Sequence, residues 1–156
     1  MNQELVFFDI DGTLSVPRYN DNGRLVIGFS DEGWENFCNN AGEDGYRDCI
    51  VVKPVVRYAE KRKSEGALLY VLSTAHYENE VKSKHKFINE TFPGLFEEVL
   101  TVPRDPDKLT VISGMAEERG LKLSECELVE DTYATILKAN EIGIKATHIS
   151  EIVCNL

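Results

Sequence analysis

An apolar run that ends in two aspartates and a glycine is the feature that most constrains the fold of this sequence. Leu5–Phe8 is apolar at every position, and a run this short indicates a buried strand rather than a helix. Asp9 and Asp11 follow it and, two residues apart on a strand, share one face. Gly12 then allows the backbone to turn sharply. The stretch therefore predicts two carboxylates on the same side of the carboxyl end of a buried strand.

The rest of the chain alternates short apolar runs with longer segments of helical pattern. Strands that alternate with helices of roughly ten to fifteen residues are typical of βαβ units and of a parallel sheet. The predicted fold class is therefore α/β, with a doubly wound, Rossmann-like parallel sheet, helices on both faces and a short cap insertion after the first strand. Further strands are expected at residues 67–72, 96–102, 126–129 and 144–149, and helices at residues 54–64, 78–91, 107–119 and 133–141.

The long connection after the first strand predicts an insertion. About forty residues separate this strand from the helix expected at Pro54, which is too many for an ordinary strand-to-helix connection. We expect residues 15–52 to form a small cap or lid on a single domain that spans residues 1–156. Within it, residues 24–29 have the pattern of one strand of a hairpin, and Ser30 is a suitable N-cap for a helix.

Aromatic residues are frequent in this predicted cap, and two interpretations of them are open. Their rings can stack on a nucleobase, or they can form a small core of the cap itself. The helical spacing of Trp34 and Phe37 favours the second interpretation for these two residues. The residues concerned are Tyr19, Trp34, Phe37 and Tyr46.

Charge and composition argue against several classes of function. The formal net charge of −10 disfavours a nucleic-acid polymer or an anionic membrane surface as the main partner. The four cysteines have no CxxC spacing, so buried free thiols are expected rather than a zinc or redox site. No signal peptide or membrane-spanning run is evident, and a cytoplasmic protein, monomeric or homodimeric, is expected.

Polar side chains also follow other predicted strands. Ser73 and Thr74 come directly after one apolar run, and Glu130 and Asp131 come after another. Lys108 opens a predicted helix, where the helix dipole disfavours a cation unless a phosphate or an ionised aspartate faces it. Each of these residues taken singly has a plain structural explanation, such as a helix start. Their order along the chain instead predicts one crevice at the strand ends that binds Mg²⁺ and a phosphate through hard oxygen ligands.

This series of residues resembles the four motifs of the haloacid dehalogenase superfamily of phosphohydrolases. The resemblance runs from Val6 to Ile149, and the first motif is the most specific of the four. The matching residues are Asp9, Asp11, Gly12 and Thr13 for the first motif, Ser73 for the second, Lys108 for the third, and Glu130 with Asp131 for the fourth.

The resemblance implies a magnesium-dependent phosphomonoester hydrolase. Asp9 would attack the phosphorus atom and form an aspartyl-phosphate, which divides one difficult displacement into two easier ones. Asp11 would protonate the leaving-group oxygen and then activate the water that hydrolyses the intermediate. Lys108 and a hydroxyl, on Ser73 or alternatively on Thr74, would bind the phosphoryl oxygens.

The same resemblance implies how Mg²⁺ is held. Asp9, Asp131 and the backbone carbonyl of Asp11 would be ligands, and Glu130 would reach the ion either directly or through a water. Superfamily members that cleave carbon–halogen bonds generally lack the second aspartate. The presence of Asp11 therefore favours phosphoester hydrolysis over dehalogenation.

Part of the sequence also resembles the 5′-nucleotidase and deoxyribonucleotidase branch of the superfamily. Residues 84–93, 128–133 and 143–145 carry this likeness, while Glu130 departs from the aspartate more common there. The substrate implied is a small phosphorylated metabolite such as a nucleotide. Two alternatives stay open, namely a catalytically silent phosphate-binding or regulatory module on the same fold and a phosphomutase.

Overall fold

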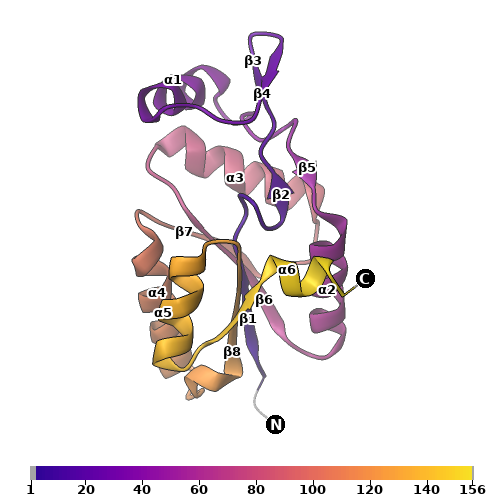
Figure 1. The fold of residues 1–156 in the computed structure, drawn as a ribbon, viewed down its shortest axis with the longest axis vertical. Coiled ribbons are helices and arrows are strands. Elements are labelled where there is room, and N and C mark those ends of the chain that lie inside the picture. The colour runs from indigo at the N-terminus through magenta and orange to yellow at the C-terminus, as the bar shows by residue number, and fades with distance from the viewer. Residues whose placement is uncertain (1–2, 156) are drawn as a thin grey trace.

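The computed structural model describes residues 3–155 and has a parallel sheet at its centre (Figure 1). Its five strands lie in the order β7-β6-β1-β8-β9, and every neighbouring pair is parallel. The first strand of the sequence, β1, is therefore the middle strand of the sheet. The strands are β1 (Leu5–Phe8), β6 (Leu68–Thr74), β7 (Glu98–Val102), β8 (Cys126–Glu130) and β9 (Lys145–His148).

Helices cover both faces of the sheet, which confirms the predicted doubly wound α/β class (Figure 1). Val6 and Phe8 of β1 pack with helices α2, α3 and α6. Leu5 and Phe7 point to the opposite face and pack with α4 and α5. Burial on both faces explains why the strand is apolar throughout rather than alternating. The helices are α2 (Lys53–Ser64), α3 (Glu78–Thr91), α4 (Asp105–Glu118), α5 (Tyr133–Ile142), α6 (Ile149–Val153) and the 3₁₀ turn η1 (Leu123–Glu125).

Several element boundaries differ from those predicted. The strand β6 continues through Ser73 and Thr74, because its neighbour β7 pairs with both residues. Helix α4 begins at Asp105, two residues earlier than predicted, with a proline in its first turn, where the missing N–H leaves no bond unmade. The strand expected at residues 144–149 gives way at Ile149 to α6, a helix that was not predicted.

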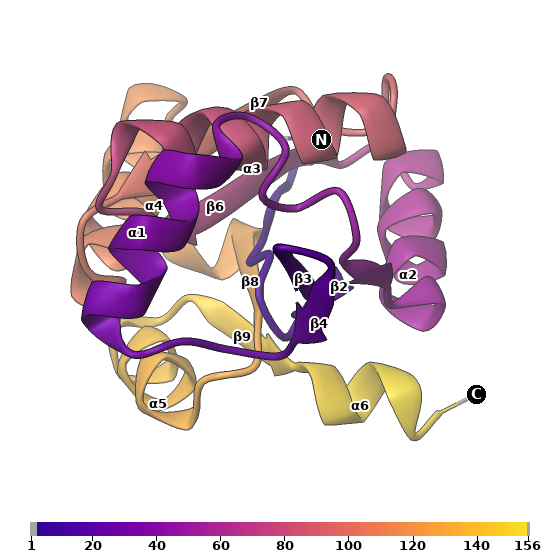
Figure 2. The ribbon, with the colours of Figure 1, turned by 90° about the horizontal axis from the view of Figure 1, so that it is seen from above.

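The insertion lies above the carboxyl ends of the sheet strands (Figure 1), and Figure 2 shows it from above. Its first and last strands, β2 and β5, pair antiparallel and form a stem, while β3 and β4 form a hairpin that ends at Val26. Ser30 caps helix α1 as predicted, because its Oγ accepts a hydrogen bond from the backbone N–H of Gly33 at 3.1 Å. The elements are β2 (Ser15–Val16), β3 (Tyr19–Asp21), β4 (Arg24–Val26), α1 (Asp31–Ala41) and β5 (Ile50–Val51).

The aromatic rings of the insertion pack against one another. The ring of Tyr19 lies with its centroid 5.1 Å from that of Trp34, and the rings of Phe29 and Phe37 stack with centroids 4.8 Å apart. The side chains of Tyr19, Phe37 and Tyr46 are buried. The aromatic residues therefore form a core of the insertion, which is the second of the two interpretations drawn from the sequence.

None of the helices within residues 3–155 is long and apolar enough to cross a lipid bilayer. The four cysteines are free in this part of the chain, but only two of them are buried, so the expectation of buried thiols is wrong for Cys49 and Cys154. Cys38 and Cys126 are buried, Cys49 is half-buried and Cys154 is exposed.

Candidate active site

The residues singled out at strand ends lie along one edge of the sheet. Asp9 directly follows β1, and its backbone N–H donates to the carbonyl of Val129 in β8 at 3.1 Å. Glu130 is the last residue of β8 and Asp131 follows it. Because β1 lies between β6 and β8, the parallel arrangement brings their carboxyl ends together.

Three of the carboxylates form a cluster. Asp9, Glu130 and Asp131 each offer an oxygen, and these atoms all lie within 4.8 Å of one another. Gly12 packs directly against this cluster with φ +79°, and a Cβ at this position would lie 2.3 Å from Oδ2 of Asp131. Only glycine fits this turn without strain or collision. Hard oxygen ligands gathered in this way suit a divalent cation such as Mg²⁺, so the residues present fit the ion implied by the sequence.

Lys108 lies in the first turn of α4 and points into the carboxylate cluster. Its side chain is 1% exposed. Its Nζ lies 3.2 Å from Oδ1 of Asp9 and donates to Oε2 of Glu130 at 2.9 Å. A third carboxylate, that of Asp105, lies 3.3 Å away. These acidic partners explain why a lysine occupies a helix N-terminus, where the dipole disfavours a cation.

Burial and mutual repulsion perturb the acids of this cluster. Burial raises the pKa of Asp9 to about 7; Lys108 opposes this shift, and the nearby carboxylates of Glu130 and Asp11 add to it. Burial likewise raises the pKa of Glu130 and of Asp131. Burial lowers the pKa of Lys108, but Asp9 and Glu130 outweigh that effect and the net pKa is raised, so the ammonium stays charged. The cluster thus has an excess of buried acid that further positive charge would stabilise.

Asp11 belongs to a second group of side chains, next to the insertion. The hydroxyl of Tyr46 lies 2.8 Å from Oδ1 and 3.0 Å from Oδ2 of Asp11 and donates to this carboxylate. The hydroxyl of Tyr19 lies 3.4 Å from Oδ1. Burial, reinforced by the Asp11 charge, raises the pKa of Tyr46 well above its ordinary value, so its hydroxyl remains a donor. The side chain of Asp11 therefore contacts the insertion and α3, and it is not one of the three carboxylates of the cluster.

Lys84 in α3 is a residue of this second group that the sequence reasoning did not select as a site residue. Its side chain is 1% exposed, and its Nζ lies 3.3 Å from Oδ2 of Asp11 and 3.1 Å from Oε2 of Glu80. It also donates to Oγ of Ser73 at 2.9 Å and to the carbonyl oxygen of Thr74. Of the two candidate hydroxyls, that of Ser73 is the one in contact with Lys84.

A signal for Lys84 was present in the sequence. It precedes Phe87 by three residues and Ile88 by four, so it lies on the buried stripe of α3. A lysine on an apolar helix face requires a buried acidic partner. The partners come from β1, β6 and the insertion, which helical periodicity does not identify.

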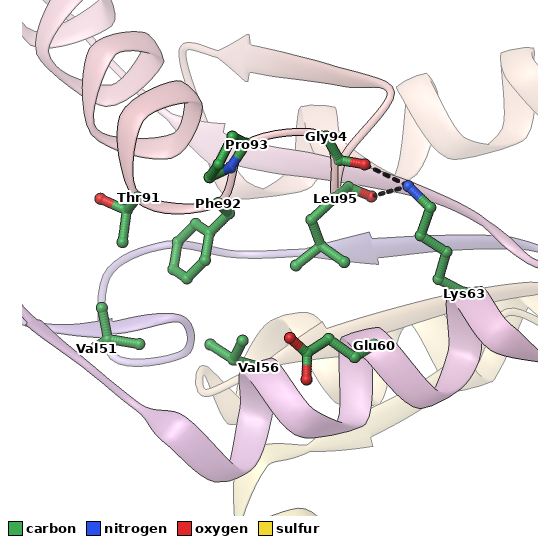
Figure 3. A pocket seen from close by; sticks show the side chains of 9 residues that line it. All are labelled: Val51, Val56, Glu60, Lys63, Thr91, Phe92, Pro93, Gly94 and Leu95. Carbon is green, nitrogen blue, oxygen red and sulfur yellow. Dashed lines mark hydrogen bonds between the residues drawn. The ribbon is translucent and has the colours of Figure 1, made fainter.

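The structure also has a cavity away from these residues. A cavity of about 500 Å³ opens between α2 and the turn that follows α3 (Figure 3). Its charged residues are Glu60 and Lys63, and Lys63 donates to the backbone carbonyls of Gly94 and Leu95. None of the acids at the strand ends lines it.

Comparison with known proteins supports the fold and leaves the sequence without a close match. No family model and no curated protein matches the chain. The haloacid dehalogenase-like family hydrolase SP0104 from Streptococcus pneumoniae is similar in structure, with a TM-score of 0.63, 17% identity, and coverage of 92% of this chain and 83% of that chain.

Two further solved structures are similar. The HAD family enzyme BT-2542 from Bacteroides thetaiotaomicron, in complex with magnesium and inorganic phosphate, has a TM-score of 0.56 at 16% identity, covering 94% of each chain. The N-terminal part of BF1531 from Bacteroides fragilis, which contains a phosphatase domain complexed with Mg, has a TM-score of 0.56 at 13% identity, covering 93% of this chain and 35% of that one. The chain has the haloacid dehalogenase-like fold that its sequence motifs imply.

Proposed function

We propose that this protein is a magnesium-dependent phosphomonoester hydrolase that acts on a small phosphorylated metabolite through an aspartyl-phosphate. The observation that carries the proposal is the position of Asp9, at the end of the central strand, 3.2 Å from Lys108 and within one carboxylate cluster. A solved structure of similar fold that contains magnesium and inorganic phosphate supports the same proposal.

Asp9 is the proposed nucleophile. One of its oxygens would attack the phosphorus atom as the bond between phosphorus and the leaving-group oxygen breaks, which gives a covalent aspartyl-phosphate. Lys108 favours the ionised form that attacks, because its ammonium lies 3.2 Å from Oδ1 of Asp9. The same ammonium can stabilise charge on the transferring phosphoryl group.

Mg²⁺ would be held by Asp9, Asp131 and the backbone carbonyl of Asp11. Glu130 offers an oxygen to the same cluster, and its bond to Lys108 at 2.9 Å orients it there. When bound, the ion would offset the negative charge of the acids and of the substrate phosphate. Asp9 and Glu130 are buried there, and Asp131 is half-buried.

The remaining phosphoryl oxygens would bind at the end of β6. Ser73 supplies a buried hydroxyl there, with Thr74 as the alternative, and Lys84 supplies a second ammonium 2.9 Å from the Ser73 Oγ. Two buried lysines, Lys84 and Lys108, both act on the charge of Asp9 and would compensate locally for the overall negative charge of the protein, which otherwise repels a phosphate.

Asp11 is the proposed acid and base. It would give a proton to the leaving-group oxygen in the first half of the reaction and take one from water in the second. The resemblance of residues 84–93 to the nucleotidase branch makes a nucleotide the first substrate to examine. The packed aromatic core of the insertion leaves recognition of a base to residues other than its buried rings.

The experiment that tests this function is hydrolysis of p-nitrophenyl phosphate with Mg²⁺, followed by a screen of nucleotides and sugar phosphates. We expect wild-type turnover, its loss on removal of Mg²⁺ with EDTA, and a loss of about 10³-fold or more in Asp9→Asn, because the amide is no nucleophile. Asp44→Asn, which changes an exposed carboxylate of the insertion, is the matched control and should retain activity. Absence of wild-type turnover, or undiminished turnover by Asp9→Asn, would contradict the proposal.

A further inference from the structure

We propose that Tyr46 of the insertion is a positioning residue for Asp11, so that the insertion supplies part of the acid–base machinery of the site. This inference rests on the proposed function. Its basis is the hydroxyl of Tyr46, which lies 2.8 Å and 3.0 Å from the two carboxylate oxygens of Asp11. The two residues lie thirty-five positions apart in the sequence, on different parts of the fold.

The hydroxyl of Tyr46 occupies a fixed place because its ring is locked into a core. The side chain is 1% exposed. Its ring centroid lies 5.7 Å from that of Tyr19, 6.2 Å from that of Trp34 and 5.9 Å from that of Phe87 in α3. A ring packed on three sides has one low-energy position, since interiors are packed as densely as crystals. Asp11 is thereby tied to a rigid aromatic cluster.

Two donors from different elements hold the Asp11 carboxylate. Tyr46 approaches from the insertion, and Lys84 approaches Oδ2 from α3 at 3.3 Å. The Lys84 ammonium also has Ser73 and Glu80 as partners, so it is a shared donor. The Tyr19 hydroxyl, at 3.4 Å, is a more distant donor. Among these contacts, that of Tyr46 is the shortest and the one that spans both oxygens.

Such a restraint matters because proton transfer depends on geometry. In the first half of the reaction Asp11 gives its proton to the leaving-group oxygen as the bond to phosphorus breaks. In the second half its carboxylate takes a proton from the water that attacks the aspartyl-phosphate, and the Asp9 carboxylate leaves. Tyr46 keeps its own proton throughout and only directs the carboxylate. Without the hydroxyl, the Asp11 side chain can rotate out of reach of the water.

The test compares Tyr46→Phe with wild type on p-nitrophenyl phosphate and Mg²⁺. Departure of nitrophenolate needs little help from an acid, whereas hydrolysis of the aspartyl-phosphate needs the base. We therefore expect kcat to fall about 10- to 100-fold, which is part of the rate enhancement that general base catalysis usually provides. The value of kcat/KM should change by less than about threefold. A burst of nitrophenolate equal to the enzyme concentration should appear, because hydrolysis of the intermediate becomes rate-limiting.

Two controls separate positioning from a structural effect. Tyr70→Phe removes another buried tyrosine hydroxyl, one that accepts from Arg119 at 2.8 Å on the side of α4, and should leave kcat and kcat/KM unchanged. In an Asp11→Asn background, Tyr46→Phe should cost less than about twofold, because the carboxylate that it directs is gone.

Several outcomes would overturn the inference. They are an unchanged kcat in Tyr46→Phe, a parallel fall of kcat and kcat/KM without a burst, and an undiminished cost in the Asp11→Asn background. Wild type without turnover would instead contradict the proposed function, and this inference with it, so the two failures are distinguishable.

Discussion

Burial is the main influence on the acidic groups around Asp9, and the neighbouring charges modify its effect. Two carboxylates other than that of Asp9 lie close to the ammonium of Lys108, at 2.9 Å for Glu130 and 3.3 Å for Asp105, and Asp131 shares a cluster with Asp9 and Glu130. Burial raises the pKa of Asp9 to about 7; the Lys108 ammonium opposes this shift, and the carboxylates of Glu130 and Asp11 add to it.

Binding of Mg²⁺ should therefore depend on pH. The ion needs ionised carboxylates, and the metal-free protein holds a proton on Asp9 below its pKa of about 7, so protons compete with the metal there. We expect the apparent dissociation constant to rise by up to about tenfold for each pH unit below about 7, and to level off above it. Calorimetry in two buffers of different ionisation enthalpy would measure the released proton. An affinity that does not change with pH would contradict this expectation.

At the scale of single residues, the sequence predicted which acids lie at strand ends but not which side chains surround each of them. The position of Asp9, Glu130 and Asp131 at strand ends follows from the apolar runs that precede them. The separation of Asp11 from this cluster was not predictable, because it depends on the tyrosine and lysine that attract it from the insertion and from α3.

Helix α3 shows how one element links the two halves of the site. Its apolar side chains Phe87 and Ile88 anchor it on the sheet, and the same stripe carries Lys84 and Glu80, which are 1% and 4% exposed. The bounds of the helix were predicted correctly, since a clear helical pattern ends at a proline and a glycine. The buried charged residues of this helix were not predicted, because their partners lie on other elements.

Removing the charge of Lys84 should destabilise the protein strongly. In Lys84→Met, Glu80 and Asp11 lose a buried cation, and the unpaired acid is expected to lower the free energy of unfolding by about 3–5 kcal/mol. Lys82→Met on the same helix is the matched control, because its ion pair with Glu78 is exposed and should be worth less than about 1 kcal/mol. Urea denaturation of both variants measures the difference. Equal free energies of unfolding for the two variants would contradict the expected stabilisation by the buried Lys84 ion pairs.

For the whole molecule, stability depends on two hydrophobic cores, one on each face of the sheet, rather than on disulfide bonds. One core joins β1 to α2, α3, α6 and the insertion, and the other joins it to α4 and α5. The cysteines within the described residues are free, and two of them belong to these cores. Burial raises the pKa of Cys38 to about 12 and that of Cys126 to about 11, so both thiols stay protonated near neutrality.

Thiol alkylation should therefore report the integrity of the fold. At about pH 8 iodoacetamide should modify the exposed Cys154 first, whereas Cys38 and Cys126 should react at least about 100-fold more slowly, because they are buried and hold little thiolate. In denaturant all should react alike. Mass spectrometry of partially labelled protein checks the order, and rapid labelling of Cys38 in the native state would contradict it.

Local pattern by itself determined the fold class, the succession of strands and helices, and the acids at strand ends, because burial on a strand or a helix imposes a period that the sequence must carry. Only the tertiary structure decided which strand lies at the centre, how the insertion sits over the strand ends, and which side chains surround Asp11. These features depend on contacts between residues far apart in the sequence, such as that of Tyr46 with Asp11, thirty-five residues apart. The periodicity of a single strand or helix carries no information about which distant side chain will lie beside it.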